Sequence, residues 1–254
     1  GRLNTRARVW GLSFAPDCRA LVAAVADKTV WLWDIGRGWQ ASRLRGHSER
    51  VLSVAFSPNG ALLASGSHDR KVVLWQPRGG QVLRVFQGHG GVFDLLFSPD
   101  GALLLALFGD RSLRIWSTGT GQEVLVGQVG EAEGIAFAPR TSLLIAVSWD
   151  GRLRFWDLGL VLSGGSGGGR MVETGEPAFR AAFSPDGSLL ACGGKDGAVR
   201  LWEMAALLRQ ETATVGPLQA LNGQMGDVSS LAFSPDGALL ASASWDGNVR
   251  VWGV

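Results

Sequence analysis

Histidine, cysteine and acidic side chains are the groups in this 254-residue chain that could catalyse a reaction or bind a metal ion. The chain has three histidines, two cysteines and 22 acidic residues. Cys18 and Cys192 are far apart, and His47 and His89 belong to a repeated Gly-His pattern, which leaves His68 unassigned. A metal site needs at least three well-spaced ligands, and no Gly-x-Ser-x-Gly elbow or phosphate-binding Gly-Lys-Ser/Thr element stands out. We therefore predict no catalytic residues, no metal site and no cofactor.

The composition narrows the class of protein. Hydrophobic residues make up 46% of the chain and charged residues 18%, which is enough apolar material for one large or two modest cores. The net charge is only +2, and no long run of either sign forms a polybasic tail. Two distant cysteines favour a reducing, intracellular setting, cytoplasmic or nuclear. Without an apolar run of 18 residues or a signal-peptide pattern, we expect neither a membrane span nor secretion.

The strongest feature of the sequence is an internal repeat. Six segments of 22 residues align without a gap, namely 12–33, 54–75, 95–116, 135–156, 181–202 and 231–252. Each predicts three short strands separated by a Ser/Ala-Pro-Asp-Gly-like turn and an Asp-containing turn, because these residues provide the backbone angles that hairpins need. A fourth candidate strand lies between segments, as in 81–86 and 122–126. Four strands per repeat are typical of a propeller blade.

Two columns of the repeat indicate how each blade is held together. One column is tryptophan, at Trp33, Trp75, Trp116, Trp156, Trp202 and Trp252. Their burial predicts a large apolar contribution to the core. The second column is the aspartate of the turn before that strand, at Asp27, Asp69, Asp110, Asp150, Asp196 and Asp246. We expect these carboxylates to make local hydrogen bonds.

The chain resembles the WD-repeat (WD40-type) family in these columns, in Trp33-Asp34 and Trp156-Asp157, and in Gly46-His47 and Gly88-His89. The resemblance implies an all-β propeller of six four-stranded antiparallel blades in one domain, residues 1–254. Members of the family usually have seven blades, so six is a departure. We expect the ring to close by pairing of the N- and C-terminal strands, with residues 1–4 as the outer strand of the last blade, because closure removes a dangling sheet edge.

The resemblance also implies a hydrogen-bonded tetrad of His, Ser/Thr, Asp and Trp within a blade. It maps best onto His47, Ser65, Asp69 and Trp75. The other blades are incomplete: Ala106 replaces the serine of the third, and Gln128 and Gln224 stand at the histidine position of the fourth and sixth. We expect those blades to depend more on packing.

Two segments interrupt the repeat. Residues 163–169 are all Ser or Gly and predict a flexible connector that looks like an engineered linker. Residues 203–211 fit either a short helical turn or, as we favour, a longer loop.

In the WD-repeat family the residue before the turn aspartate, and two near the start of the innermost strand, face the narrower top surface around the central channel. Carried over to this sequence, these positions predict a partner-binding surface that mixes large aromatics with charges. It comprises Arg8, Trp10, Arg50, Leu52, His68, Phe93, Glu131, Glu133, Trp149, Phe179, Lys195, Asp227 and Trp245. The alternative is that each aromatic packs under a neighbouring loop.

We therefore expect a non-catalytic scaffold that binds a peptide or protein segment on this surface, as a monomeric propeller or as part of a larger assembly. A sensor or autoinhibitory domain from a larger signalling protein is an alternative. Nucleic-acid binding is a weaker one, because Arg114, Arg154, Arg200 and Arg250 all lie two residues before a blade tryptophan and so distribute the positive charge.

Overall fold

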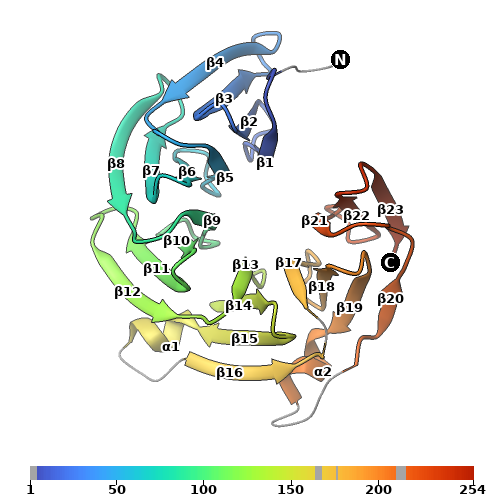
Figure 1. Cartoon of the computed structure of the whole chain (residues 1–254). Coiled ribbons are helices and arrows are strands. Elements are labelled where there is room, and N and C mark those ends of the chain that lie inside the picture. Colours follow the sequence, from blue (N-terminus) through green and yellow to red (C-terminus); the bar gives the residue numbers. More distant parts are fainter. Residues whose placement is uncertain (1–4, 164–167, 176, 210–215) are drawn as a thin grey trace. The chain divides into compact units, whose positions relative to one another are not determined.

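A computed structural model describes residues 5–163, 168–175, 177–209 and 216–254 of the chain. Its strands form six antiparallel sheets, which we call blades 1 to 6 in chain order (Figure 1). Blades 1 to 5 have four strands each, and blade 6 has three within the described residues. The all-β fold of six antiparallel blades expected from the sequence is confirmed.

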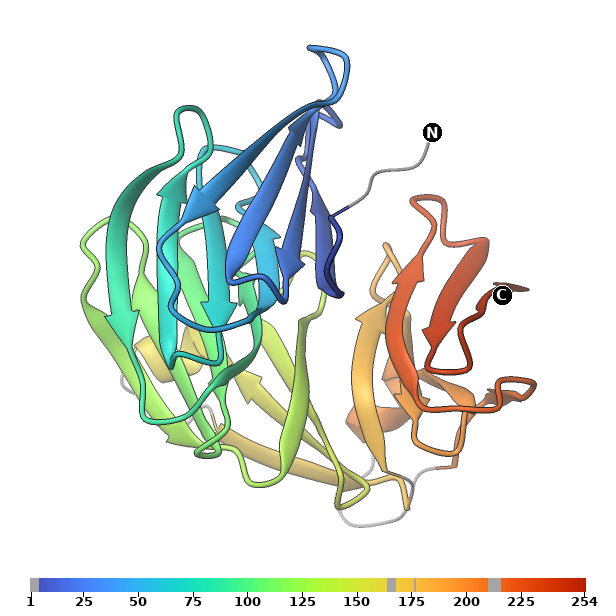
Figure 2. The same ribbon diagram turned by 45° about the horizontal axis from the view of Figure 1, so that its top comes forward.

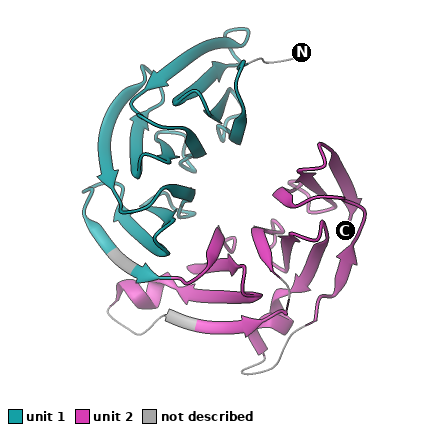
Figure 3. Ribbon diagram, in the orientation of Figure 1, with its two compact units in different colours: residues 1–128 teal, residues 129–254 magenta. Residues whose placement is uncertain are grey.

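The contacts within the chain divide it into two compact units, residues 1–128 and 129–254 (Figure 3). Unit 1 holds blades 1 to 3 and unit 2 holds blades 4 to 6. That the whole chain forms one domain stays a prediction.

Unit 1 consists of three four-stranded blades. Blade 1 has β1 (Val9–Phe14), β2 (Ala20–Val25), β3 (Thr29–Asp34) and β4 (Gln40–Arg45); blade 2 has β5 (Val51–Phe56), β6 (Leu63–Ser67), β7 (Lys71–Gln76) and β8 (Gln81–Gln87); blade 3 has β9 (Val92–Phe97), β10 (Leu103–Phe108), β11 (Ser112–Ser117) and β12 (Glu123–Gln128). The first strands β1, β5 and β9 pack side by side, and the strands of each blade twist, as β1 to β4 do in Figure 2.

Unit 2 repeats this plan and adds two short helices. Blade 4 has β13 (Ala132–Phe137), β14 (Leu143–Ser148), β15 (Arg152–Asp157) and β16 (Gly168–Glu173); blade 5 has β17 (Ala178–Phe183), β18 (Leu189–Gly194), β19 (Val199–Glu203) and β20 (Gln219–Leu221); blade 6 has β21 (Val228–Phe233), β22 (Leu239–Ser244) and β23 (Val249–Gly253). Helix α1 (Leu158–Leu162) follows β15, and α2 (Met204–Arg209) follows β19.

The turn between the first two strands of most blades forms as its residues dictate. In blade 3 the hydroxyl of Ser98 donates to Asp100, and the backbone N–H of Leu103 donates back to Ser98 Oγ at 2.9 Å. The same Ser-Asp bond recurs between Ser184 and Asp186 in blade 5. These side chains satisfy backbone and hydroxyl groups that the tight turn would otherwise leave unpaired, so the turn fixes the register of the hairpin.

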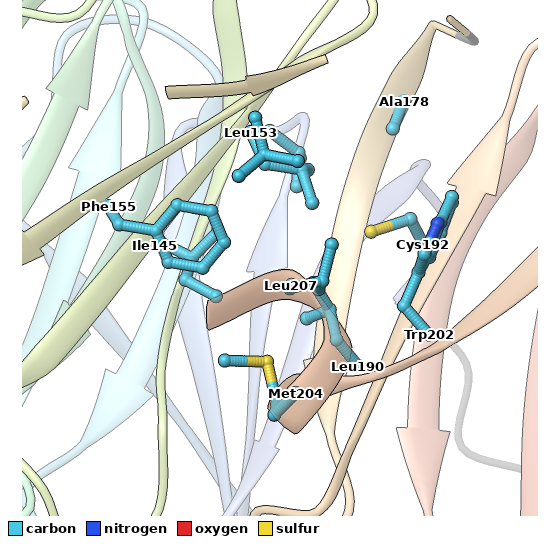
Figure 4. Close-up of a cluster of buried hydrophobic side chains, with 11 residues drawn as sticks. Ile145, Leu153, Phe155, Ala178, Leu190, Cys192, Trp202, Met204 and Leu207 are labelled. Atoms are coloured by element: carbon cyan, nitrogen blue, oxygen red, sulfur yellow. The ribbon is translucent and has the colours of Figure 1, made fainter. Parts of the chain in front are cut away.

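Most buried apolar clusters of the described residues lie between neighbouring blades, as one cluster in unit 2 shows. Ile145 and Phe155 of blade 4 face Leu190 of blade 5, and Met204 and Leu207 of α2 close the cluster (Figure 4). The last two are 5% and 0% exposed, so α2 is an integral part of the core. Because a single blade cannot bury both of its faces, this packing between repeats provides most of the apolar stabilisation.

Two details of the sequence interpretation are tested by the described residues. Residues 204–209 form helix α2 where we favoured a loop, because Met204 and Leu207 gain an apolar partner in the core. The Ser/Gly stretch is not a connector throughout: Ser163 caps α1, and Gly168 begins β16 by pairing with Trp156. Residues 164–167, and the strand expected from residues 1–4, lie outside the described residues.

Candidate interaction surface at the Asp-turn edge

The turn aspartates lie at one edge of each unit, which we call its Asp-turn edge. In unit 1 this edge carries the turns of Asp27, Asp69 and Asp110, and in unit 2 those of Asp150, Asp196 and Asp246. The residues just before each first strand lie beside these turns, because Ala26 N–H donates to Arg8 O and His68 N–H donates to Arg50 O. The sequence positions expected to form a surface therefore meet at this edge within each unit.

Blade 2 carries the four residues of the implied tetrad in hydrogen-bonding contact. Trp75 Nε1 donates to Ser65 Oγ at 2.8 Å, and Ser65 Oγ lies 2.8 Å from His47 Nε2. His47 Nδ1 lies 3.0 Å from Asp69 Oδ2. Because a carboxylate only accepts, Nδ1 carries the proton, and a neutral imidazole then accepts the Ser65 hydroxyl at Nε2. The chain of donors runs from the buried tryptophan to the turn.

The environment of Asp69 favours its ionised form. Burial raises its pKa, but hydrogen bonds from His47 and from the backbone N–H groups of Ser48 and Lys71 outweigh that effect and lower the pKa of Asp69 to about 2. This carboxylate is therefore a fixed acceptor that ties the turn to the preceding loop.

The turn aspartates of unit 2 pair with arginine. Asp150 and Arg154 are 2.7 Å apart, Asp196 and Arg200 2.6 Å, and Asp246 and Arg250 2.9 Å. From the sequence alone these arginines were expected to distribute positive charge, and the ion pairs with the aspartates were not predicted. The signal was available, since each arginine follows its aspartate by four residues along a turn and a strand.

Blade 6 uses glutamine at the histidine position. Gln224 Nε2 donates to Ser242 Oγ at 2.9 Å, and Trp252 Nε1 donates to the same oxygen at 2.8 Å. Gln224 Oε1 is buried without a hydrogen-bond partner among the described residues. The glutamine thus makes the hydrogen bond to serine that His47 makes in blade 2, but it makes no bond corresponding to the one between His47 and the turn aspartate.

In blade 3 packing replaces the tetrad, as expected from Ala106. Trp116 stacks on Phe86 with ring centroids 4.8 Å apart and meets Phe108 edge-on at 6.2 Å. Aromatic pairs in these geometries contribute beyond their buried area. His89, the Gly-His residue of this blade, is exposed.

The Asp-turn edge of unit 2 brings four of the expected surface residues together. Trp149 meets Phe179 edge-on, with ring centroids 4.9 Å apart, and Lys195 Nζ lies 4.6 Å from the Trp149 ring centroid. The Trp149 side chain also hydrogen bonds to Glu133. Despite these contacts Trp149 remains 40% exposed. It is a supported aromatic side chain with an accessible face, and its role as a surface anchor stays a prediction.

Glu133 has an altered titration because it lies in this cluster. Burial raises its pKa, the positive charge of Arg180 and the hydrogen bond from Trp149 act in the opposite direction, and the net effect is a raised pKa. Arg180 is held in turn by the backbone carbonyls of Glu133 and Phe179, each at 2.9 Å.

The other expected residues of unit 2 lie at the same edge. Trp245 is 67% exposed, and its backbone N–H donates to Asp227 O at 3.0 Å. Glu131 is exposed, and its carbonyl accepts from Trp149 N–H at 3.2 Å. Trp245 therefore presents a larger accessible area than Trp149.

The Asp-turn edge of unit 1 centres on Trp10. The guanidinium carbon of Arg8 lies 5.0 Å from the Trp10 ring centroid, and that of Arg50 lies 5.9 Å away. Trp10 and Phe93 are each 36% exposed, and Leu52 is half-buried. The five expected aromatics are thus divided between the units, two in unit 1 and three in unit 2.

In the part of the chain that the structure describes, no group of three or more histidine, cysteine or acidic side chains is placed to hold a metal ion. Cys18 is exposed and Cys192 buried, and both are unpaired. Neither described helix has the length and apolar character needed to cross a bilayer.

Comparison with known proteins gives partial matches to several relatives. The chain is 43% identical over 72 residues to the Notchless protein homolog of Arabidopsis thaliana, which covers 28% of this chain and 15% of the relative. It is 39% identical over 80 residues to the probable cytosolic iron-sulfur protein assembly protein Ciao1 of Culex quinquefasciatus, covering 30% and 24%. It is 33% identical over 72 residues to Coronin-7 of Rattus norvegicus, covering 28% and 8%. The matches thus span less than a quarter of the length of each relative.

The family comparison covers far more of the chain. The model of the WD40 family, described as WD domain, G-beta repeat, matches residues 3–34, 38–76, 80–117, 123–157, 176–203 and 216–253. Each match contains the first three strands of one blade, and most also contain the last strand of the blade before it. The matches together cover most of the chain, so the chain belongs to the WD40 repeat family.

Proposed function

We propose that this protein is a non-catalytic scaffold that binds a segment of a partner protein at its Asp-turn edge. WD40 propellers generally serve as scaffolds for protein interactions, which supports the broad class. One observation carries the location: Trp149 and Trp245 are held at this edge of unit 2 with 40% and 67% of their surfaces exposed. Large aromatics that are both supported and accessible are typical anchors of protein interfaces.

The charges around Trp149 fit a protein partner. The ammonium group of Lys195 lies over the Trp149 ring, and Glu133 accepts a hydrogen bond from the Trp149 indole. Two further acidic residues, Glu131 and Asp227, lie along the same edge. A partner side chain packed on the Trp149 indole would be surrounded by these hydrogen-bond donors and acceptors. An apolar centre with polar groups around it is typical of a protein interface. An intracellular location, supported by two unpaired cysteines, is part of this proposal.

The proposal is tested with the double variant Trp149→Ala/Trp245→Ala. Partners retained by the immobilised wild-type protein would be identified, produced in pure form and titrated against both proteins. We expect the variant to bind at least about tenfold more weakly, since interface anchors often contribute 2 kcal/mol or more. Its thermal midpoint should stay close to that of the wild type.

The matched control is Trp39→Ala. Trp39 is 44% exposed and lies in the loop between β3 and β4, away from the Asp-turn edge. The control should bind the partner as the wild type does. Equal binding by all three proteins would reject the proposed location, and collapse of the thermal midpoint in the double variant would show that the two indoles stabilise the fold.

A further inference from the structure

The two units differ sharply in charge. Unit 1 has 15 lysine and arginine residues against 9 acidic ones, whereas unit 2 has 9 against 13. The small net charge of the whole chain conceals this difference. Within unit 2 three of the arginines are paired with the turn aspartates, so the excess of positive charge belongs to unit 1.

The same turn is built differently in the two units. The residue after the turn aspartate has a positive φ in all six blades. In unit 2 it is glycine each time, at Gly151, Gly197 and Gly247, with φ of 70°, 77° and 82°. In unit 1 it is basic each time, at Lys28, Arg70 and Arg111, with φ of 72°, 69° and 69°.

Side chains with a Cβ are strained at this backbone conformation, and glycine is not. Three basic residues at a position where the same chain elsewhere uses glycine therefore carry a conformational cost that glycine would avoid, and all three are exposed. Such residues are typical of positions kept for function at the expense of stability.

These turns lie next to one another in unit 1. Lys28 Nζ of blade 1 lies 3.7 Å from Glu49, just before the first strand of blade 2. A Cβ added at Gly91, before the first strand of blade 3, would lie 3.2 Å from the His68 ring of blade 2. The turns of blades 1 and 2 thus each meet the start of the next blade, so the basic turns follow one another along the edge of unit 1.

Most acidic groups at this edge are directed to other partners. Asp27 accepts hydrogen bonds from Thr29 and Trp31, Asp69 from His47, and Asp110 from Ser112. Glu49 forms an ion pair with Lys28, and both side chains of this pair are about half exposed. The three aspartates keep their negative charge but are half-buried, whereas the three basic turn residues, and Arg8 and Arg50 beside Trp10, are exposed. The accessible charge at the Asp-turn edge of unit 1 is therefore mainly positive.

We propose that the Asp-turn edge of unit 1 binds an acidic, carboxylate-rich segment of a partner protein. The inference rests on the proposed function, since it assigns the chemistry of a partner to the same edge, but it uses a different unit and different residues. Guanidinium groups offer several N–H donors to a carboxylate at once, which suits them to this role.

The contacts of Trp10 favour a carboxylate partner over a nucleic acid. Single-stranded nucleic acids bind by stacking bases on accessible aromatic faces. Here the guanidinium carbons of Arg8 and Arg50 lie 5.0 and 5.9 Å from the Trp10 ring centroid, so the ring already has two cationic neighbours. This edge therefore offers a partner more accessible positive charge than accessible aromatic surface for stacking.

The test titrates a glutamate-rich peptide with a fluorescent label against the 254-residue chain at low salt. Two variants remove the same three charges: Lys28→Gln/Arg70→Gln/Arg111→Gln keeps a side chain at the strained positions, and Lys28→Gly/Arg70→Gly/Arg111→Gly relieves the strain. We expect both to bind the peptide at least about tenfold more weakly than the wild type. The glycine variant should in addition unfold at a higher temperature, which a purely structural role of these residues would not give.

The charge control is Arg19→Gln/Arg37→Gln/Arg78→Gln. These exposed arginines of unit 1 lie at the opposite edge, as the bond from Ile35 N–H to Arg19 O shows for the first two. The control loses the same net charge and should keep its affinity for the peptide. An equal loss in the control would overturn the proposal, because net charge alone would then explain binding.

Two further outcomes separate the alternatives. An oligouridylate of equal charge that binds the wild type more tightly than the peptide would overturn the proposal in favour of nucleic acid. The variant Trp149→Ala/Trp245→Ala should retain the peptide, so a failure of the proposed function in unit 2 would leave this result standing. Loss of the peptide from that variant would contradict the assignment to unit 1.

Discussion

A single serine shows how one side chain connects the core of a blade to its surface turn. Ser65 is fully buried, and its Oγ accepts from Trp75 Nε1 while lying 2.8 Å from His47 Nε2. Its hydroxyl therefore joins the buried indole to the His47–Asp69 pair. Removing such a linking group leaves two buried polar atoms without partners, and that cost exceeds the value of one hydrogen bond.

We expect Ser65→Ala to lower the free energy of unfolding by about 2 to 3 kcal/mol, because the indole N–H and His47 Nε2 both lose their partner. Urea unfolding followed by tryptophan fluorescence measures the change. The exposed Ser230 of β21 provides the control, and Ser230→Ala should stay within about 0.5 kcal/mol of the wild type. Equal stability of Ser65→Ala and wild type would mean that the tetrad is not a stabilising network.

At the scale of the element, the strands were far easier to predict than the partners of their side chains. The segment 54–75 contains half of β5, all of β6 and most of β7, because turn residues and apolar runs are local signals. Helix α1 was not predicted because it is only five residues long. Its start depends on Asp157, whose carboxylate accepts hydrogen bonds from the backbone N–H groups of Gly159 and Leu160. A single cap of that kind fits a turn as well as a helix.

The candidate surface was predicted only in part for a related physical reason. Residue spacing placed Trp149 and Lys195 at one edge, but their direct contact depends on the packing of blade 4 against blade 5, which no local pattern encodes. The pairing of Asp196 with Arg200 could have been found from spacing alone. The basic turns of unit 1 were overlooked because they stand out only when φ is known at each turn.

Blade 6 offers a prediction at this scale, since it has an incomplete version of the network in blade 2. We expect Gln224→His to stabilise the protein by about 0.5 to 1.5 kcal/mol, because an imidazole can bond Ser242 at one nitrogen and Asp246 at the other, and the unpaired Gln224 Oε1 is removed. The urea midpoint reports the gain. Gln224→Ala, which keeps neither bond, should be less stable than the wild type; a histidine variant no better than alanine would contradict the explanation.

At the scale of the whole molecule, the repeated turns make stability depend on pH in a direction that can be worked out. Hydrogen bonds from Ser184 and Ser188 lower the pKa of Asp186 to about 2, and backbone hydrogen bonds from Met225 and Asn248 do the same for Asp246. With Asp69 these groups stay ionised in the folded protein well below the ordinary aspartate pKa of about 3.9. The unfolded chain therefore binds more protons in that range.

We predict that the free energy of unfolding is largest above about pH 4 and falls steadily as the pH is lowered toward 2, where the folded carboxylates finally take up protons. Glu133 acts in the opposite sense, because its raised pKa makes its ionised form a cost at neutral pH that mild acid relieves. Several lowered aspartates outweigh one raised glutamate, so acid should destabilise the fold overall. The urea midpoint measured against pH, with the 11 tryptophans as the probe, tests this balance.

Asp69→Asn identifies the contribution of one turn to that curve. The amide cannot ionise, so we expect the variant to be less stable than the wild type at pH 7, with the difference shrinking as the pH falls from 4 to 2. Asp17→Asn removes the same charge from an exposed turn and should leave the curve nearly parallel to that of the wild type. If the Asp69→Asn curve also ran parallel, the stabilisation would come from packing around the turn, because only a difference in proton binding between folded and unfolded chains can make the two curves converge in acid.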